Sequence, residues 1–275
     1  MKGKLFSCWA VLFVFIGCTK NTPKQFEKLG AAQTGITFEN TLKNTPQLNI
    51  LNYLYYYNGA GVVALDSNND GLTDLYFTGN ETPARLFLNR GNLKFEDITE
   101  ASGIGPTKGW SFGATHVDIN NDGLQDIYVC QASKYRGLKG RNQLFINQGI
   151  NDQGIPTFAE GAKIFGLDFE GLSTQSAFFD YDLDGDLDLF LLNHSVHPNN
   201  NYGLGSKRAT FDSISGDRFY ENIDGRYVDR SKEAGIYQGK SGYGLRLSIS
   251  DVNNDGYPDI YVGNDFFEND SLYIN

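Results

Sequence analysis

The stretch DINNDGLQDIYV, residues 118–129, decides the fold, because three similar stretches begin at residues 66, 180 and 251. They read DSNNDGLTDLYF, DYDLDGDLDLFL and DVNNDGYPDIYV. Each is an acidic turn that runs directly into a short apolar strand. A repeat of this kind indicates a chain built from several copies of one structural unit.

Each copy is followed by the same elements. A strand with the pattern L-F-x-N or a close variant lies at 86–89, 144–147, 219–222 and 272–275, and in the first three copies an aromatic residue follows, with a glycine eight residues later. A glycine-rich approach strand such as GWSFGATHVD (109–118) leads into the next turn. Units of four short strands are typical of β-propeller blades. We therefore predict an all-β propeller of four-stranded blades over residues 34–275.

The completeness of this propeller stays open. Four repeats fit a closed ring of four blades or part of a larger ring, and the end of the chain inside the fourth repeat favours truncation at the C-terminus. The segment ITFENT (36–41) is similar to KFEDIT (94–99), so it is expected to add a strand to the last blade. A β-sandwich is the structural alternative, but it would not need one acidic turn at the same strand junction four times.

The acidic turns, at 66–74, 118–126, 180–188 and 251–259, are predicted to bind Ca²⁺, about one ion per loop. We number each loop from 1 to 9. Oxygen-bearing side chains recur at positions 1, 3, 5 and 9, with glycine at 6 for the sharp bend and a main-chain carbonyl at 7. The predicted side-chain ligands are Asp66, Asn68, Asp70, Asp74, Asp118, Asn120, Asp122, Asp126, Asp180, Asp182, Asp184, Asp188, Asp251, Asn253, Asp255 and Asp259. The predicted carbonyl ligands are those of Leu72, Leu124, Asp186 and Tyr257.

Three alternatives bear on these turns. Asp, Asn and Gly are also ordinary turn formers, but four copies in register favour metal binding. An EF-hand would need a glutamate at position 12, where this chain has Phe77, Val129, Leu191 and Val262. Mg²⁺ is disfavoured because it tolerates crowded protein cages poorly.

The approach strand GWSFGATHVD, the loop DINNDGLQD and the strand IYV resemble the FG-GAP/VCBS repeats of integrin α-subunit propellers. The added patterns L-F-x-N-x-G and F-x-D-x-T-x-x-x-G-I resemble exported bacterial proteins associated with an ASPIC/UnbV domain, a domain that is itself not visible in this sequence. The resemblance covers residues 34 to 275. It implies a propeller, often of seven blades, with Ca²⁺ held between adjacent strands.

The N-terminus is predicted to be a lipoprotein signal peptide, residues 1–18, followed by a linker, 19–33. Lys2 and Lys4 precede an apolar run that is too short to span a membrane, and FIGC (15–18) resembles a lipobox with Cys18 as the lipid anchor. Ordinary signal cleavage is the alternative. The expected location is the outer membrane or the cell surface of a bacterium. Cys130 is then the cysteine left in the folded part, so we expect a buried thiol and no disulfide.

The net charge of −10 and the absence of a basic sequence patch argue against nucleic acid as a partner. We find no catalytic motif, so the first hypothesis is a non-enzymatic module that binds an extracellular protein or glycan. The alternative is a carbohydrate-active enzyme with its site on insertion loops such as 193–217. His194 and His197 in that insertion have the spacing of a metal pair but lack a third ligand.

Overall fold

In a computed structural model of the chain, residues 25–105, 109–196, 210–265 and 268–275 are described. They form four antiparallel sheets, each wound from consecutive strands. Blade 1 holds β1 (Val62–Leu65), β2 (Asp74–Phe77), β3 (Arg85–Asn89) and β4 (Phe95–Asp97), and blade 2 holds β5 (Trp110–Val117), β6 (Asp126–Ala132), β7 (Gln143–Ile150) and β8 (Pro156–Glu160). Blade 3 holds β9 (Ser173–Phe179), β10 (Asp188–Asn193), β11 (Arg218–Ile223) and β12 (Arg226–Asp229), and blade 4 holds β13 (Gly244–Ser250), β14 (Asp259–Asn264) and β15 (Ser271–Tyr273).

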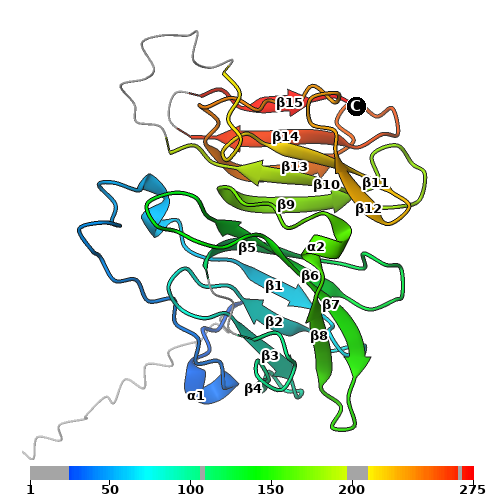
Figure 1. Ribbon diagram of the computed structural model, residues 1–275. Coiled ribbons are helices and arrows are strands. Elements are labelled where there is room, and N and C mark those ends of the chain that lie inside the picture. The colour runs from blue at the N-terminus through cyan, green and yellow to red at the C-terminus, as the bar shows by residue number, and fades with distance from the viewer. Residues whose placement is uncertain (1–24, 106–108, 197–209, 266–267) are drawn as a thin grey trace, which may run out of the picture.

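The four blades follow one another in a row (Figure 1), with the first strand of each blade next to the first strand of the following one. This arrangement confirms the predicted all-β propeller. Blade 4 has three strands within the described residues, whereas the others have the predicted four. The helical elements are short: α1 (Ala31–Thr34), α2 (Ala162–Phe165) and the 3-10 turn η1 (Leu54–Tyr57). Within the described ranges, no helix is long and apolar enough to cross a membrane.

The core lies between the blades. Side chains alternate across a strand, so one face of each sheet packs against the next sheet. Between blades 1 and 2, Leu86 and Tyr76 pack against Ile127 and Val129. Between blades 2 and 3, the cluster contains Tyr128, Leu189 and the thiol of Cys130. Cys130 is buried as predicted, and burial raises the pKa of its thiol to about 12.

Glycines allow the first strands to approach one another closely. A Cβ atom on Gly113 would lie 2.6 Å from the carbonyl oxygen of Thr174 in β9. A Cβ atom on Gly61 would lie 2.9 Å from the carbonyl oxygen of Phe112, and the Gly61 N–H donates to that same oxygen at 2.9 Å. The glycine-rich approach strands are therefore a requirement of blade packing.

The prediction for residues 36–41 is wrong. They form no strand and lie on the first blade rather than the last. Phe38 stacks on Phe77 with ring centroids 5.1 Å apart, and the side chain of Asn40 bonds to that of Asn80 at 2.7 Å. These contacts explain the placement, because they pack the half-buried rings of Phe38 and Phe77 together and pair two amides on blade 1.

His194 at the start of the insertion is a core residue. It is fully buried, its Nε2 lies 3.0 Å from the hydroxyl of Tyr53, and its ring stacks on Tyr55. Burial lowers the pKa of His194 to about 3, so the ring is neutral at pH 7. His197 lies outside the described residues, as does 197–209 of the insertion that the enzyme hypothesis uses, so that hypothesis stays a prediction.

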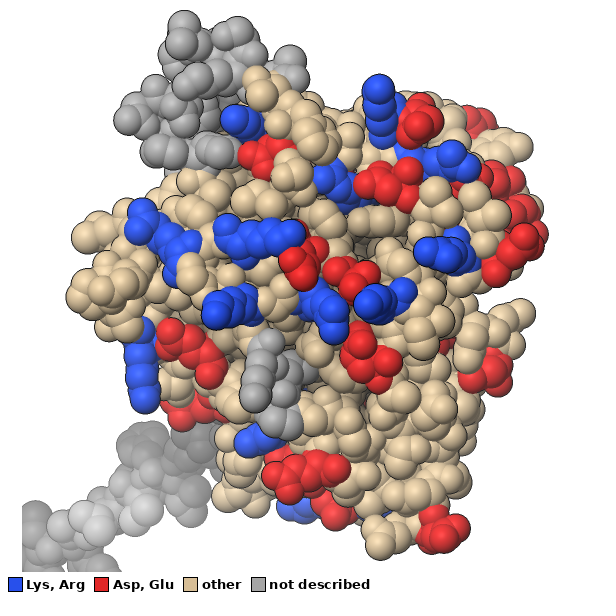
Figure 2. All heavy atoms as spheres, in the orientation of Figure 1, with Lys and Arg blue, Asp and Glu red and all other residues tan. Residues whose placement is uncertain are grey.

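Charges of both signs occupy the surface. On the face in Figure 2, Lys and Arg form a band across the middle with carboxylates between them, and Asp and Glu gather at the right edge. Several cations form ion pairs, among them Lys134 with Glu170 at 2.9 Å and Arg230 with Glu221 at 2.8 Å. The neighbouring carboxylates therefore offset the positive charge of these Lys and Arg side chains.

Candidate metal centres

Each acidic loop closes a hairpin between the first and second strands of a blade, and its first aspartate organises the turn. In loop 2, Asp118 Oδ1 accepts the N–H of Asp122 at 3.0 Å, and Asp118 Oδ2 accepts the N–H of Gly123 at 2.8 Å. The equivalent pair of bonds recurs at Asp66, Asp180 and Asp251. A carboxylate offers about four lone-pair sites, so two main-chain bonds leave oxygen lone pairs for a cation.

Two residues in the left-handed region make the bend possible. Position 4 has φ between 55° and 64° in the four loops, and the glycine at position 6 has φ between 83° and 97°. Glycine adopts this conformation without steric cost, which is why it stands at position 6 of every copy. Position 4 is asparagine in loops 1, 2 and 4, and it is Leu183 in loop 3.

Positions 3 and 5 face each other across the turn. In loop 2, Asn120 Nδ2 donates to Asp122 Oδ2 at 2.8 Å, and Asp122 Oδ1 accepts the N–H of Leu124, at position 7, at 2.8 Å. Loops 1 and 4 repeat both bonds. The predicted ligand at position 5 is thus held beside the predicted ligand at position 3, and position 7 lies in the same turn.

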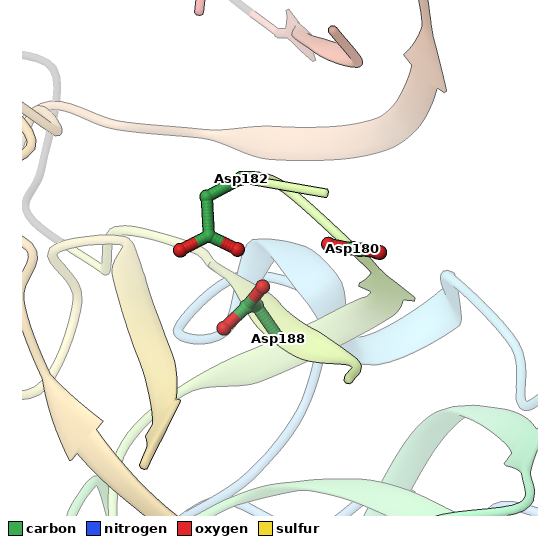
Figure 3. A group of neighbouring side chains, drawn as sticks. All are labelled: Asp180, Asp182 and Asp188. Carbon is green, nitrogen blue, oxygen red and sulfur yellow. The ribbon is translucent and has the colours of Figure 1, made fainter. Parts of the chain in front are cut away.

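Loop 3 differs because Asp182 occupies position 3 and has no amide to donate. Carboxylate oxygens of Asp180, Asp182 and Asp188 lie within 4.8 Å of one another (Figure 3). Three carboxylates at this separation repel each other unless they are protonated or share a cation. Loop 3 is therefore the loop in which the structure brings most negative charge together.

The aspartate at position 9 is buried and begins the second strand. Asp126 is fully buried; its Oδ1 accepts the N–H of Asn147 at 2.7 Å and its Oδ2 accepts the N–H of Ile119 at 3.0 Å. The same pair of bonds holds Asp74, Asp188 and Asp259 through Asn89, Asn222 and Asn275 and the position-2 residues. These main-chain bonds need no particular side chain, whereas the Nδ2 of the same asparagine donates to the carbonyl at position 8 of its own loop in all four copies. This role for the asparagine of the L-F-x-N strand was missed from the sequence, although its recurrence at one place in every repeat was the available signal.

Burial changes the acidity of these groups. It raises the pKa of Asp126 and Asp188 to about 6, opposed by the main-chain N–H groups and helped by neighbouring aspartates. It also raises the pKa of Asp74. The pKa of Asp259 is instead lowered, because the N–H groups of Asn275 and Val252 stabilise its carboxylate.

Among the described residues, three acidic side chains converge to within 4.8 Å in loop 3, without Asp184, whereas the three aspartates of loops 1, 2 and 4 do not converge to that distance. In those three loops, hydrogen bonds link positions 1, 3, 5 and 7 within one turn, as in loop 2. All-oxygen sets of this kind suit a hard cation such as Ca²⁺, which takes six to eight oxygens. The buried carboxylate at position 9 also fits, since a bound cation would offset its burial. The individual ligand assignments stay predictions.

Calcium affinity is expected to fall as the pH drops from 7 to 5. A carboxyl with a pKa of about 6, such as Asp126, must lose its proton to bind a cation, so affinity at pH 5 should be ~10-fold lower at loops 2 and 3. In the ion-free protein, the folded state holds the protons of these carboxyls more tightly than the unfolded state, whose pKa is 3.8. The resulting stability is fully present below pH 3.8 and is lost as the pH rises through about 6. A cation offsets that loss at neutral pH.

Calorimetric titrations with CaCl₂ at pH 7, 6 and 5 measure this dependence. Loop 4 provides the internal control, because the lowered pKa of Asp259 leaves it ionised over the whole range. An affinity that is flat with pH at all four loops would contradict the expectation.

Comparison with known proteins agrees with this geometry. An FG-GAP-like repeat model matches residues 66–129 and 118–191, and an FG-GAP repeat model matches residues 243–274. Each matched segment contains at least one acidic loop with its flanking strands. Cartilage acidic protein 1 of Xenopus tropicalis is 30% identical over 139 residues, which are 50% of this chain and 21% of that protein. The chain thus spans about a fifth of the length of this relative.

The matched repeats and the row of blades define an FG-GAP repeat β-propeller. The chain belongs to the FG-GAP repeat family, which confirms that part of the resemblance. Repeats of this family often bind calcium, their propellers are typical of binding and adhesion modules, and the proteins that carry them are often extracellular or at the cell surface. The resemblance to ASPIC/UnbV-associated proteins stays a prediction.

Proposed function

We propose that this chain is a calcium-stabilised propeller that acts as a binding or adhesion module for an extracellular protein or glycan. The observation that carries the proposal is the loop geometry, which is repeated in all four blades with aspartate at positions 1, 5 and 9. A site for one reaction would occur once. Four equivalent sites, one per blade, fit a role in holding the scaffold together.

Calcium would act at the hairpin between the first two strands of each blade. Position 1 follows the first strand and position 9 begins the second, as with Asp118 after β5 and Asp126 in β6. An ion held by both positions therefore ties the hairpin closed. The described residues contain one cysteine, Cys130, and it is free, so cross-strand disulfides do not supply this support there. Binding to the folded state alone stabilises it by mass action.

The anchor and the location belong to the same proposal. Cys18 and the signal segment lie outside the described residues, and their support is the sequence FIGC after an apolar run. Lipid at Cys18 would place the propeller on the outer membrane or the cell surface. Intact-mass spectrometry of the native protein is expected to show a chain that begins at Cys18 with added acyl mass. An unmodified Cys18 would contradict the anchor and leave the propeller function standing.

Binding is tested with the purified propeller on glycan and extracellular-protein arrays, in 2 mM CaCl₂ and after removal of calcium. We expect a defined set of ligands to be retained in calcium and lost or weakened without it, because the surface loops depend on an ordered scaffold. Heat-denatured protein is the control for adhesion of unfolded chain. An absence of specific binding in calcium would count against the module, and turnover of a bound glycan would favour the enzyme instead.

A further inference from the structure

Asn147 in the second blade contacts two acidic loops. Its N–H donates to the position-9 carboxylate of its own blade, Asp126, at 2.7 Å. Its side-chain Nδ2 donates to the carbonyl of Ser67, at position 2 of loop 1, at 2.8 Å. Asn147 is only 2% exposed, so water does not compete well for these bonds. One buried residue therefore holds a main-chain group of loop 1 and a predicted ligand of loop 2.

A second bond joins the same two loops. Asn69, at position 4 of loop 1, donates from Nδ2 to the carbonyl of Gly123, at position 6 of loop 2, with a separation of 3.1 Å. The N–H of Gly123 is in turn held by Asp118 Oδ2 at 2.8 Å. The bond from loop 1 thus ends on the residue that the first predicted ligand of loop 2 positions.

Loops 2 and 3 are not joined in this way. The side chain of Asn222, which is equivalent to Asn147, donates at 3.3 Å to the carbonyl of Leu187 in its own loop, as Asn147 also does to Gln125, but among the described residues it forms no bond to loop 2. Asn121, equivalent to Asn69, forms no side-chain hydrogen bond to loop 3 among the described residues. The next connection is from Asn275 to the carbonyl of Tyr181 in loop 3, at 2.5 Å. The connections therefore group the loops as 1 with 2, and 3 with blade 4.

We propose that Asn69 and Asn147 are positioning residues that make loops 1 and 2 one cation-binding unit. An ion in loop 2 fixes Asp118 and Asp126 and thereby Gly123 and Asn147, which are the two partners of loop 1. Loop 1 then loses less conformational freedom when its own ion binds, so each ion raises the affinity for the other. This inference rests on the proposed calcium binding and adds to it that the ions bind in a coupled pair.

The test uses the full chain with loops 3 and 4 disabled by Asp184→Ala and Asp255→Ala. Calorimetric titration with CaCl₂ then measures the two ions of loops 1 and 2. Adding Asp122→Ala leaves loop 1 alone, and adding Asp70→Ala leaves loop 2 alone. The product of the two stepwise association constants is expected to exceed the product of the single-loop constants by ~5-fold or more, the usual range of coupling between sites.

Asn69→Gly removes the side-chain bond while allowing the left-handed backbone of position 4, where φ is 57°. We expect it to reduce the excess severalfold. Asn121→Gly is the matched control, because it makes the same change at the same loop position, with φ of 55°. It should leave the excess unchanged. Circular dichroism establishes that each variant is folded. If one single-loop variant unfolds, the product of the two stepwise constants is compared between Asn69→Gly and Asn121→Gly in the two-loop background.

The possible outcomes distinguish a failure of the coupling between loops 1 and 2 from a failure of the proposed calcium binding. Two ions that bind with no excess would overturn the coupling and leave calcium binding intact. An equal loss of excess in Asn69→Gly and Asn121→Gly would also overturn it, because the bond between the loops would then not be the cause. No binding to any variant or to the unmodified chain would refute the calcium proposal itself.

Discussion

Removal of calcium is expected to lower the melting temperature of this protein by about 10–40 °C. A ligand at 100 times its Kd stabilises a folded protein by ~2.7 kcal/mol per site, and four loops would together contribute on the order of 5–10 kcal/mol. For a chain of this size, each kcal/mol corresponds to ~2–4 °C. The loss also releases repulsion between carboxylates such as Asp180, Asp182 and Asp188, whose oxygens lie within 4.8 Å of one another.

Differential scanning calorimetry at pH 7.5 measures this effect, with 2 mM CaCl₂ against an equal excess of chelator. Readdition of CaCl₂ should restore the higher transition, whereas MgCl₂ at the same concentration should restore little of it, because Mg²⁺ demands a smaller octahedral site. If chelator leaves the transition where it was, calcium does not stabilise this fold.

Replacing Asp126 with alanine is expected to destabilise the protein by about 3–5 kcal/mol in chelator, and by roughly the contribution of one ion more in calcium, because Asp126 is also a predicted ligand. The change leaves the N–H groups of Asn147 and Ile119 buried without their acceptor, and each such loss costs ~1–3 kcal/mol. The cavity left in a fully buried position adds to this cost. Urea denaturation at pH 7.5, in calcium and in chelator, gives both free energies of unfolding.

Asp122→Ala in the same loop is the matched comparison. Asp122 is exposed, so water can replace its bonds to Leu124 and Asn120 once the side chain is gone. We expect it to reduce stability in calcium by roughly the contribution of one ion, ~2–3 kcal/mol, and to change stability in chelator little. Equal effects of the two substitutions in chelator would show that position 9 has no structural role beyond metal binding.

Much of the architecture follows from local sequence. The alternation of approach strand, acidic loop and apolar strand predicted the hairpins of blades 1 to 4, because glycine at position 6 and aspartate at position 1 specify the turn through short-range bonds. The predicted side-chain ligands at positions 1, 3 and 5 also rest on spacing, since residues two apart in a tight turn face the same point. These inferences need no knowledge of which blades touch.

Long-range contacts could not be inferred in the same way. The segment around Phe38 resembles an outer strand, yet stacking on Phe77 and bonding to Asn80 hold it on blade 1. The asparagine of the L-F-x-N strand was visible as a repeat, but its bond to a carboxylate 21 residues earlier, as from Asn147 to Asp126, depends on strand register. His194 has a spacing suited to metal binding, and only the tertiary structure shows it buried among tyrosines.

Chemical modification of the Cys130 thiol can report the separation of blades 2 and 3. The thiol lies in the cluster between blades 2 and 3, and its pKa of about 12 leaves almost no thiolate to react at neutral pH. A thiol-specific reagent can modify it only when those two sheets part and admit water. The rate of that modification, followed at Cys130 by peptide mapping, therefore reports how often this interface opens.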